Sequence, residues 1–328
     1  MEAVRNITIA LFLVSCTLLF IAADNLEYLK ETFGVKLKEN KDVSGSQEFL
    51  NSVFFSVDRE NQPMVVNSKK VIVQNSSGKI ILMAPFGSVI STDETFEYEG
   101  DSGEVIPSKD QINLFGKVKL KKTDLTITGE EMSVLQKSQK AVLKRSVNTR
   151  ARTSNGNKIR LKSVNAHFDG ELGIVRYEKN IRGNLSFANK SFSPPMAIQS
   201  EKLAYYLNSG KMILEDKVKI DRDNIHLTAQ RGSIFLNKES RDVNYFELND
   251  DVRFSEKFTA SNGQSILRTG LSQKLEGFGF QRKLVFSGFP KLKQLDDLIQ
   301  GNKIVIEESN ELVEIINTNS KFKFNQSR

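Results

Sequence analysis

Few residues of this chain have the types and spacing that catalysis needs. Asp250–Asp251 and Asp296–Asp297 are adjacent carboxylate pairs, and paired carboxyl groups can serve as general acid and general base. Neighbouring residues of a β-strand point to opposite faces, however, so an adjacent pair cannot converge on one substrate. We therefore expect no catalytic residue in either pair.

The histidines and the cysteine form no recognisable ligand or nucleophile motif. The two histidines, His167 and His226, are far apart in sequence, and Cys16 is the one cysteine. A zinc site needs several such ligands at close spacing, and a single cysteine excludes an internal disulfide. Nucleotide-binding loops and the G-x-S-x-G motif of serine hydrolases are missing as well. The sequence predicts no enzyme, no metal and no cofactor, and a binding role remains.

The composition favours a folded chain with a weak preference for anionic partners. The chain has 328 residues, 39% of them hydrophobic, and 47 Lys and Arg against 40 Asp and Glu, a net charge of +7. That excess suits lipid phosphate, a membrane surface or nucleic acid, and it equally suits a solvated basic surface. This length accommodates one large β domain or two smaller ones.

A strongly basic segment lies in the middle of the chain. It has no interleaved aromatic residues, whereas proteins that bind single-stranded nucleic acid use aromatic side chains as stacking platforms, so we expect no nucleic-acid partner. A solvated strand face explains the segment most simply, and a patch for lipid phosphates is the alternative. The candidates for that patch are Lys144, Arg145, Arg150 and Arg152.

The N-terminus carries an uncharged run, residues 7–23, preceded by Arg5. Its length fits a retained membrane anchor, and the preceding charge predicts a cytoplasmic N-terminus. A cleaved signal peptide is an alternative for which the run is slightly long. A lipoprotein signal ending at Cys16 is another, although the run stays apolar beyond that residue. All three interpretations place the rest of the chain outside the cytoplasm.

The body reads as many short strands. Apolar residues alternate with charged or polar residues in Ile159–Lys162, Val218–Asp221 and Val252–Ser255, as on a sheet with one buried face. Turn residues such as Asn155–Gly156 and Asn262–Gly263 separate these runs. This pattern predicts an all-β sandwich, barrel or solenoid-like fold.

A weak internal repeat supports stacking of similar units. Its aliphatic positions are separated by 29, 34, 37 and 34 residues, as subtraction of their numbers gives. Each unit is expected to be a strand, a tight turn, a strand ending at the aliphatic position and a further strand. Such a unit cannot bury its apolar face alone, but stacked units can. The aliphatic positions are Val118, Val147, Ile181, Val218 and Val252.

The units resemble the periplasmic bridge proteins of lipopolysaccharide transport, the LptC/LptA (OstA-like) family. The resemblance rests on Leu125–Gly129, Ala141–Val147, Asn155–Ile159 and Tyr177–Gly183, and on the pair of units from Ile198 to Phe254. Phe286–Pro290 and Ile299–Ile304 are similar to the later strands of the family. The N-terminal run adds an LptC-like feature, although an LptC is typically shorter than this chain.

The resemblance implies a fold and a domain order. The expected fold is all-β, an open twisted β-jellyroll of stacked antiparallel strands after a single N-terminal transmembrane helix. The expected domains are residues 1–24 (membrane anchor or signal), 25–195 (LptC-like jellyroll) and 196–328 (a second OstA/LptA-like domain), divided at Ser193–Pro195 because proline cannot donate to a central ladder.

The same resemblance implies a cargo, partners and a location. The cargo is lipopolysaccharide, with acyl chains in an apolar groove, carried from an inner-membrane ABC transporter complex toward the outer membrane. An LptA-like or outer-membrane bridge partner would pair with an exposed edge strand. The chain is then a single-pass inner-membrane protein with a periplasmic body.

The apolar residues of the repeats are the candidates for such a groove, and each of them fits plain core packing equally well. A structural or adhesive β-solenoid without lipid, and a glycan-active solenoid enzyme, are the competing functions. The groove candidates are Val118, Leu120, Phe168, Ile181, Tyr206, Val218, Ile220, Phe235, Phe246, Val252 and Phe254.

Overall fold

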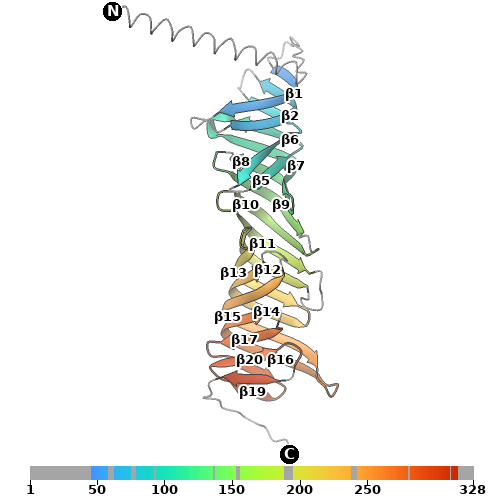
Figure 1. Cartoon of the computed structure of the whole chain (residues 1–328), viewed down its shortest axis with the longest axis vertical. Coiled ribbons are helices and arrows are strands. Elements are labelled where there is room, and N and C mark those ends of the chain that lie inside the picture. Colours follow the sequence, from blue (N-terminus) through green and yellow to red (C-terminus); the bar gives the residue numbers. More distant parts are fainter. Residues whose placement is uncertain are drawn as a thin grey trace, which may run out of the picture.

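The computed structural model describes residues 46–316, apart from 58–62, 75–78, 92–93, 136, 153–155, 188–194, 238–241, 280 and 311. These residues form a long column of strands, with β1 near one end and β19 and β20 near the other (Figure 1). No helix among them has the length and apolar character to cross a membrane. The expected transmembrane helix, with Cys16, lies outside the described residues.

The fold is all-β, as expected. The described residues form 21 strands of one antiparallel sheet, and one short 3-10 turn, η1 (Pro107–Lys109), interrupts them. The strands are β1 (Ser46–Val57), β2 (Pro63–Gln74), β3 (Lys79–Met83), β4 (Phe86–Ser91), β5 (Glu94–Glu99), β6 (Ser102–Ile106), β7 (Gln111–Lys122), β8 (Leu125–Leu135), β9 (Lys140–Arg152), β10 (Lys158–Asp169), β11 (Ile174–Ser186), β12 (Met196–Tyr206), β13 (Lys211–Arg222), β14 (Ile225–Leu236), β15 (Val243–Thr259), β16 (Ser265–Phe278), β17 (Lys283–Ser287), β18 (Lys291–Gln294), β19 (Asp297–Gln300), β20 (Lys303–Glu307) and β21 (Val313–Ile316).

Each long strand bends once and thereby belongs to two walls. The ladders between β7 and β16 all shift register near mid-strand, as between Phe115 and Val118 on β7 or between Glu215 and Val218 on β13. We call the line of these bends the corner. At both ends of the column the chain forms two short strands instead of one bent strand. β3 and β4 pair side by side with β2 at one end, and β17 and β18 pair with β16 at the other.

The corner divides the sheet into two walls. The first wall holds β4, β5, β18 and β19, together with the halves of the long strands that contain Leu120, Ile127 and Val147. The second wall holds β3, β6, β17, β20 and β21, with the halves that contain Leu114, Met132 and Leu143. Away from the corner the walls end in turns, and we call that open side the mouth.

Left-handed backbone makes the bend. On every second long strand, two consecutive residues at the corner have positive φ, a conformation that non-glycine residues rarely adopt. A bulge of this kind bends a strand and strengthens its twist. The pairs are Arg145–Ser146, Lys179–Asn180, Asp216–Lys217 and Asp250–Asp251, and Gly116 occupies the same place on β7.

These bulges explain the sequence repeat and correct one detail of it. Val118, Val147, Ile181, Val218 and Val252 each follow the corner directly and are buried. The repeat is therefore two strands with their turns. The aliphatic position does not end a strand, because one bent strand continues through it.

The two walls enclose an apolar core. Most inward side chains from both walls form one large buried cluster that includes Val66 near one end of the column and Ile306 near the other, and Phe258, Ala260 and Ile266 form a second, smaller cluster. Phe96 and Phe168 meet across the interior at 4.4 Å between ring centroids, and Phe254 and Phe286 do so at 5.1 Å. The division proposed at residue 195 stays a prediction, and β11 and β12 pair across it.

The corner geometry gives a stability prediction at Ser146, whose φ is 52°. Ser146→Val should lower the free energy of unfolding by about 1–2 kcal/mol, because a β-branched side chain is strained in the left-handed region. Ser146→Gly should match or exceed the original stability. Urea unfolding measures both changes. Equal losses for Val and Gly would show that the left-handed backbone is not what the serine supports.

Candidate lipid groove

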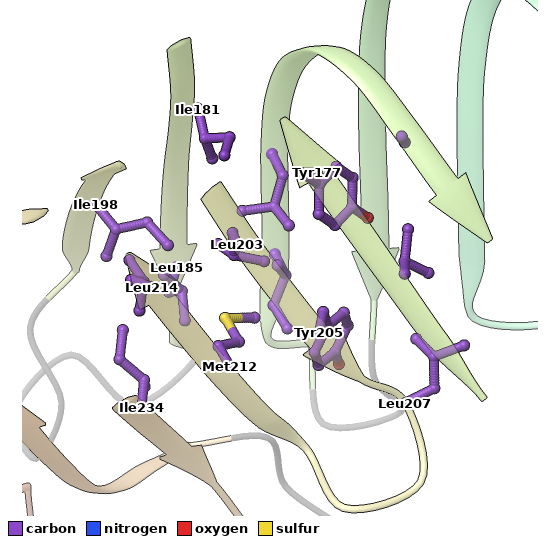
Figure 2. Close-up of a cluster of buried hydrophobic side chains, with 14 of the residues drawn as sticks. Tyr177, Ile181, Leu185, Ile198, Leu203, Tyr205, Leu207, Met212, Leu214 and Ile234 are labelled. Carbon is purple, nitrogen blue, oxygen red and sulfur yellow. The ribbon is translucent and has the colours of Figure 1, made fainter. Parts of the chain in front are cut away.

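The interior of the column consists of apolar rows that run along its axis. Because pairing is in register between neighbouring strands, Leu203, Leu214 and Leu248 fall into one row of the second wall. Ile198, Ile220 and Leu227 form the corresponding row of the first wall. Figure 2 shows part of this interior, with Tyr177, Ile198, Leu203, Tyr205, Met212 and Ile234 gathered between neighbouring strands.

Nine of the eleven groove candidates point into this interior and are buried in the core cluster: Val118, Leu120, Phe168, Ile181, Val218, Ile220, Phe246, Val252 and Phe254. Their assignment to lipid rather than to core stays a prediction. Tyr206 and Phe235 point the other way. They are half-buried, lie next to inward Tyr205 and Ile234, and are both register partners of Lys211. They belong to the outer face of the second wall.

The interior is tightly filled where the chain carries glycine. A Cβ atom at Gly277 would lie 2.1 Å from the ring of Phe246, and one at Gly183 would lie 2.5 Å from Ile198. Both glycines therefore let a large neighbour pack over the backbone. Tyr177 adds a polar contact, since its hydroxyl and that of Thr149 lie 2.9 Å apart across the walls. Burial raises the pKa of the Tyr177 hydroxyl.

Polar contacts join the two walls at the mouth. The side-chain amide of Asn157, in the turn after β9, donates to Asp242 Oδ1, in the turn before β15, at 2.9 Å. These residues are 85 positions apart in sequence and belong to turns of opposite walls. This hydrogen bond must break if the mouth is to open at that level.

A buried ionic cluster closes the mouth near the C-terminal end of the column. Arg268 and Glu256, on the first wall, are both fully buried and form an ion pair at 3.2 Å. Arg268 also donates to the carbonyl of Asn310 at 2.5 Å and stacks on Phe258. Glu256 accepts the backbone N–H of Ser309 at 2.7 Å. The turn between β20 and β21 is thus held against the opposite wall.

A second ion group extends this cluster. Arg222 pairs with Glu308 at 3.0 Å, and Arg282 approaches the same carboxylate at 3.4 Å. Arg222 Nη2 is buried without a hydrogen-bond partner, so the hydrogen-bonding capacity of this ion group is not fully satisfied. Burial lowers the pKa of both Arg222 and Arg268. Burial also raises the pKa of Glu256, although the Ser309 N–H and Arg268 act in the opposite direction.

The outer faces of the two walls differ in charge. The second wall is balanced, with pairs such as Lys202–Asp216 at 3.0 Å and Lys274–Glu247 at 3.2 Å. The outer face of the first wall is mostly basic. Its basic residues are Lys119, Lys121, Arg150, Arg152, Lys158, Arg160, Lys162, Arg182, Lys219, Arg253, Lys257, Lys291 and Lys293.

The structure divides the predicted phosphate patch. Arg150 and Arg152 lie on the basic outer face of the first wall, where Arg150 has Arg160 as its register partner. Lys144 lies on the second wall, and Arg145 lies at the corner in an ion pair with Glu131 at 2.9 Å. Arg150 therefore shares a face with basic residues of β10 and β11. The order of residues in the sequence does not show this grouping. The role of the patch stays a prediction.

The pair Asp250–Asp251 and the two histidines each lie beside a residue of opposite or potentially opposite charge. Asp250 pairs with Arg231 at 2.6 Å and Asp251 with Arg253 at 3.4 Å, both at the corner. His226 lies 2.7 Å from Asp221 on the outer face, and His167 lies 3.6 Å from Glu178. Within the described part of the chain, no group of three or more His, Cys, Asp or Glu side chains could hold a metal ion.

The comparison with protein families concerns the C-terminal part of the column. Residues 197–312 match the family model described as "LptA/(LptD N-terminal domain) LPS transport protein". The matched segment begins within β12 and ends just before β21, so it contains the ionic cluster at the mouth.

Among solved structures, the chain is similar to LptH of Pseudomonas aeruginosa, described as the LptA homologous periplasmic component of the lipopolysaccharide transport device. The identity is 12% and the TM-score 0.36, over 40% of this chain and 96% of LptH. No curated protein matches the chain.

The ionic cluster gives a prediction about stability. Arg268→Met leaves Glu256 buried without its cation and should destabilise the fold by about 3–5 kcal/mol. Adding Glu256→Gln removes the stranded charge and should restore part of that loss, which urea unfolding of the three variants measures. Arg253→Met, on the outer face, is the control and should change stability by less than about 1 kcal/mol. Additive losses from Arg268→Met and Glu256→Gln would show that the pair is not coupled.

Proposed function

We propose that this chain is a lipopolysaccharide-binding component of a periplasmic bridge, and that it holds the acyl chains of its cargo between the two walls. The family match of residues 197–312 carries the proposal, since the family is described as lipopolysaccharide transport. The apolar rows along the column give the cargo a continuous surface. Acyl chains that replace core contacts keep these side chains in apolar surroundings.

Between its two ends, the column can admit cargo only at the mouth, because the long strands run unbroken through the corner. The inward side chains are closely packed, so loading requires the walls to separate. The hydrogen bond between Asn157 and Asp242 and the contacts of Glu256 and Arg268 with the turn at 309–310 cross the mouth. Opening would break the hydrogen bond between Asn157 and Asp242 more readily than the contacts of Glu256 and Arg268, because the ionic cluster is buried. The saccharide would remain in water outside the mouth.

The ends of the column fit a bridge. Within the described residues, β1 pairs only with β2, β19 only with β18 and β21 only with β20. Strand edges of this kind are templates for a partner strand. In the proposed arrangement one end receives cargo from an inner-membrane ABC transporter complex, and the other passes it to an LptA-like or outer-membrane partner. Residues 7–23 would keep the chain in the inner membrane.

The alternative function is a structural column without cargo. The packed interior of the described residues fits it as well as it fits an unloaded groove. The two functions differ in whether lipid ever reaches the inward side chains, which the next two experiments measure.

Neighbouring tyrosines offer a matched test of the cargo. Tyr205 points into the interior and Tyr206 points outward. A benzophenone side chain at position 205 therefore samples the interior, and one at position 206 samples the outer face at almost the same place along the column. In cells, Tyr205→benzoylphenylalanine should form lipopolysaccharide adducts, and the same change at Tyr206 should form few or none. Equal adducts at both positions, or none at Tyr205 in folded protein, would favour the structural column.

Locking the mouth tests the route of entry. In a Cys16→Ser background, Asn157→Cys and Asp242→Cys can be joined by a short bismaleimide across the mouth. The joined protein should lose most of the adduct at position 205, and each single cysteine variant treated with the same reagent should keep it. Unchanged adducts in the joined protein would mean that cargo enters elsewhere, for example through an end of the column.

A further inference from the structure

Exposed apolar residues gather at the C-terminal end of the first wall. Leu267 and Leu271 on β16 are 60% and 51% exposed, and Leu298 on β19 is 43% exposed. Phe289, at the corner just before β18, is 88% exposed. On β16 these leucines alternate with buried Ile266 and Arg268, so they point away from the core.

Basic residues are paired with these leucines across the strands. Lys257 is the register partner of Leu267, and Lys293 is the partner of Leu298. Leu271 has Arg253 on one side and Lys291 on the other. We call this set, with Phe289, the leucine–lysine face: Arg253, Lys257, Leu267, Leu271, Phe289, Lys291, Lys293 and Leu298.

The positive charges of this face are largely uncompensated. Among the described residues, Lys257, Lys291 and Lys293 have no carboxylate partner, and Arg253 alone is paired, with Asp251 at 3.4 Å. Asp296 and Asp297 lie in and beside the turn between β18 and β19, on the same wall. The basic surface continues along the wall through Lys219, Arg182, Lys162, Arg160 and Arg150.

We propose that the leucine–lysine face docks on an anionic phospholipid bilayer. Exposed aliphatic side chains among lysines and arginines suit the boundary between acyl chains and headgroups, where the first enter the apolar layer and the second meet phosphates. A saccharide would leave the leucines in contact with polar groups. The outer face of the second wall has paired charges instead, so a bilayer would select one side of the column.

This docking is separate from the cargo site. The leucines point outward, whereas the cargo rows point inward, and the ionic cluster of Glu256 and Arg268 lies behind the face. A column docked in this way would present its C-terminal rungs to a lipid surface. The proposal therefore stands or falls independently of adducts at Tyr205.

The test uses the full chain in a Cys16→Ser background with vesicles. A fluorophore is attached at Leu271→Cys or Leu298→Cys, and at Ser233→Cys on the outer face of the second wall as control. Vesicles of phosphatidylcholine, with or without one third phosphatidylglycerol, carry a spin-labelled lipid that quenches on contact. Thermal unfolding confirms that each labelled variant is folded.

Quenching is expected at positions 271 and 298 in vesicles with phosphatidylglycerol, and not at position 233. Lys291→Glu with Lys293→Glu should reduce that quenching to the level of the control, because each cation near an anionic surface strengthens binding about fivefold. Absence of quenching at 271 and 298, equal quenching at 233, or equal quenching in neutral vesicles would overturn the proposal. A lipid-independent spectral change that grows with protein concentration would also overturn it, in favour of a second copy.

Discussion

The whole column depends on one constraint: the bends of neighbouring strands must lie opposite one another in the ladder. If the bends were out of step, the register between neighbouring strands would fail and buried N–H and C=O groups would lose their partners. Consecutive left-handed residues such as Asp216 and Lys217 supply the bend on alternate strands, and the strands between them cross the corner with a simple register shift. Two walls, one interior and one mouth follow from that repetition.

Along each strand, successive side chains point alternately into the interior and outward. Inward positions build the interior, and outward positions give the first wall its basic surface and the second wall its balanced one. The ionic cluster is the place where this rule changes, because Arg222, Glu256 and Arg268 occupy inward positions near the mouth. Charged groups there hold the turn after β20 by directed contacts, whereas apolar groups would hold it only by burial.

Much of the fold could be predicted from the sequence, because alternation and turn residues identify strands and the spacing of Val118, Val218 and Val252 identifies stacked units. The bend was not predicted. Asn180, Asp216 and Asp250–Asp251 are of types that adopt left-handed backbone more readily than other non-glycine residues, but Arg145–Ser146 contains neither Asn nor Asp, so residue type alone does not locate the corner on every strand. Tyr206 was assigned to the wrong face because Tyr205 and Tyr206 are equally apolar, and only register with Lys211 separates them. Arg222 and Glu256 were missed, although each lies two positions after an inward residue, Ile220 or Phe254, which was a usable signal.

The direction of the ladder has a mechanical consequence. Hydrogen bonds between strands run along the column, so a pull on its two ends loads the bonds between a given pair of strands together. Strands would then separate as whole units under tension, and the weakest pairing would set the force at which the column parts. Between β12 and β13, for example, the bonds lie on both sides of the corner, so each wall carries part of the load. A protein built in this way resists stretching through the hydrogen bonds of its backbone, and its side chains carry little of that load.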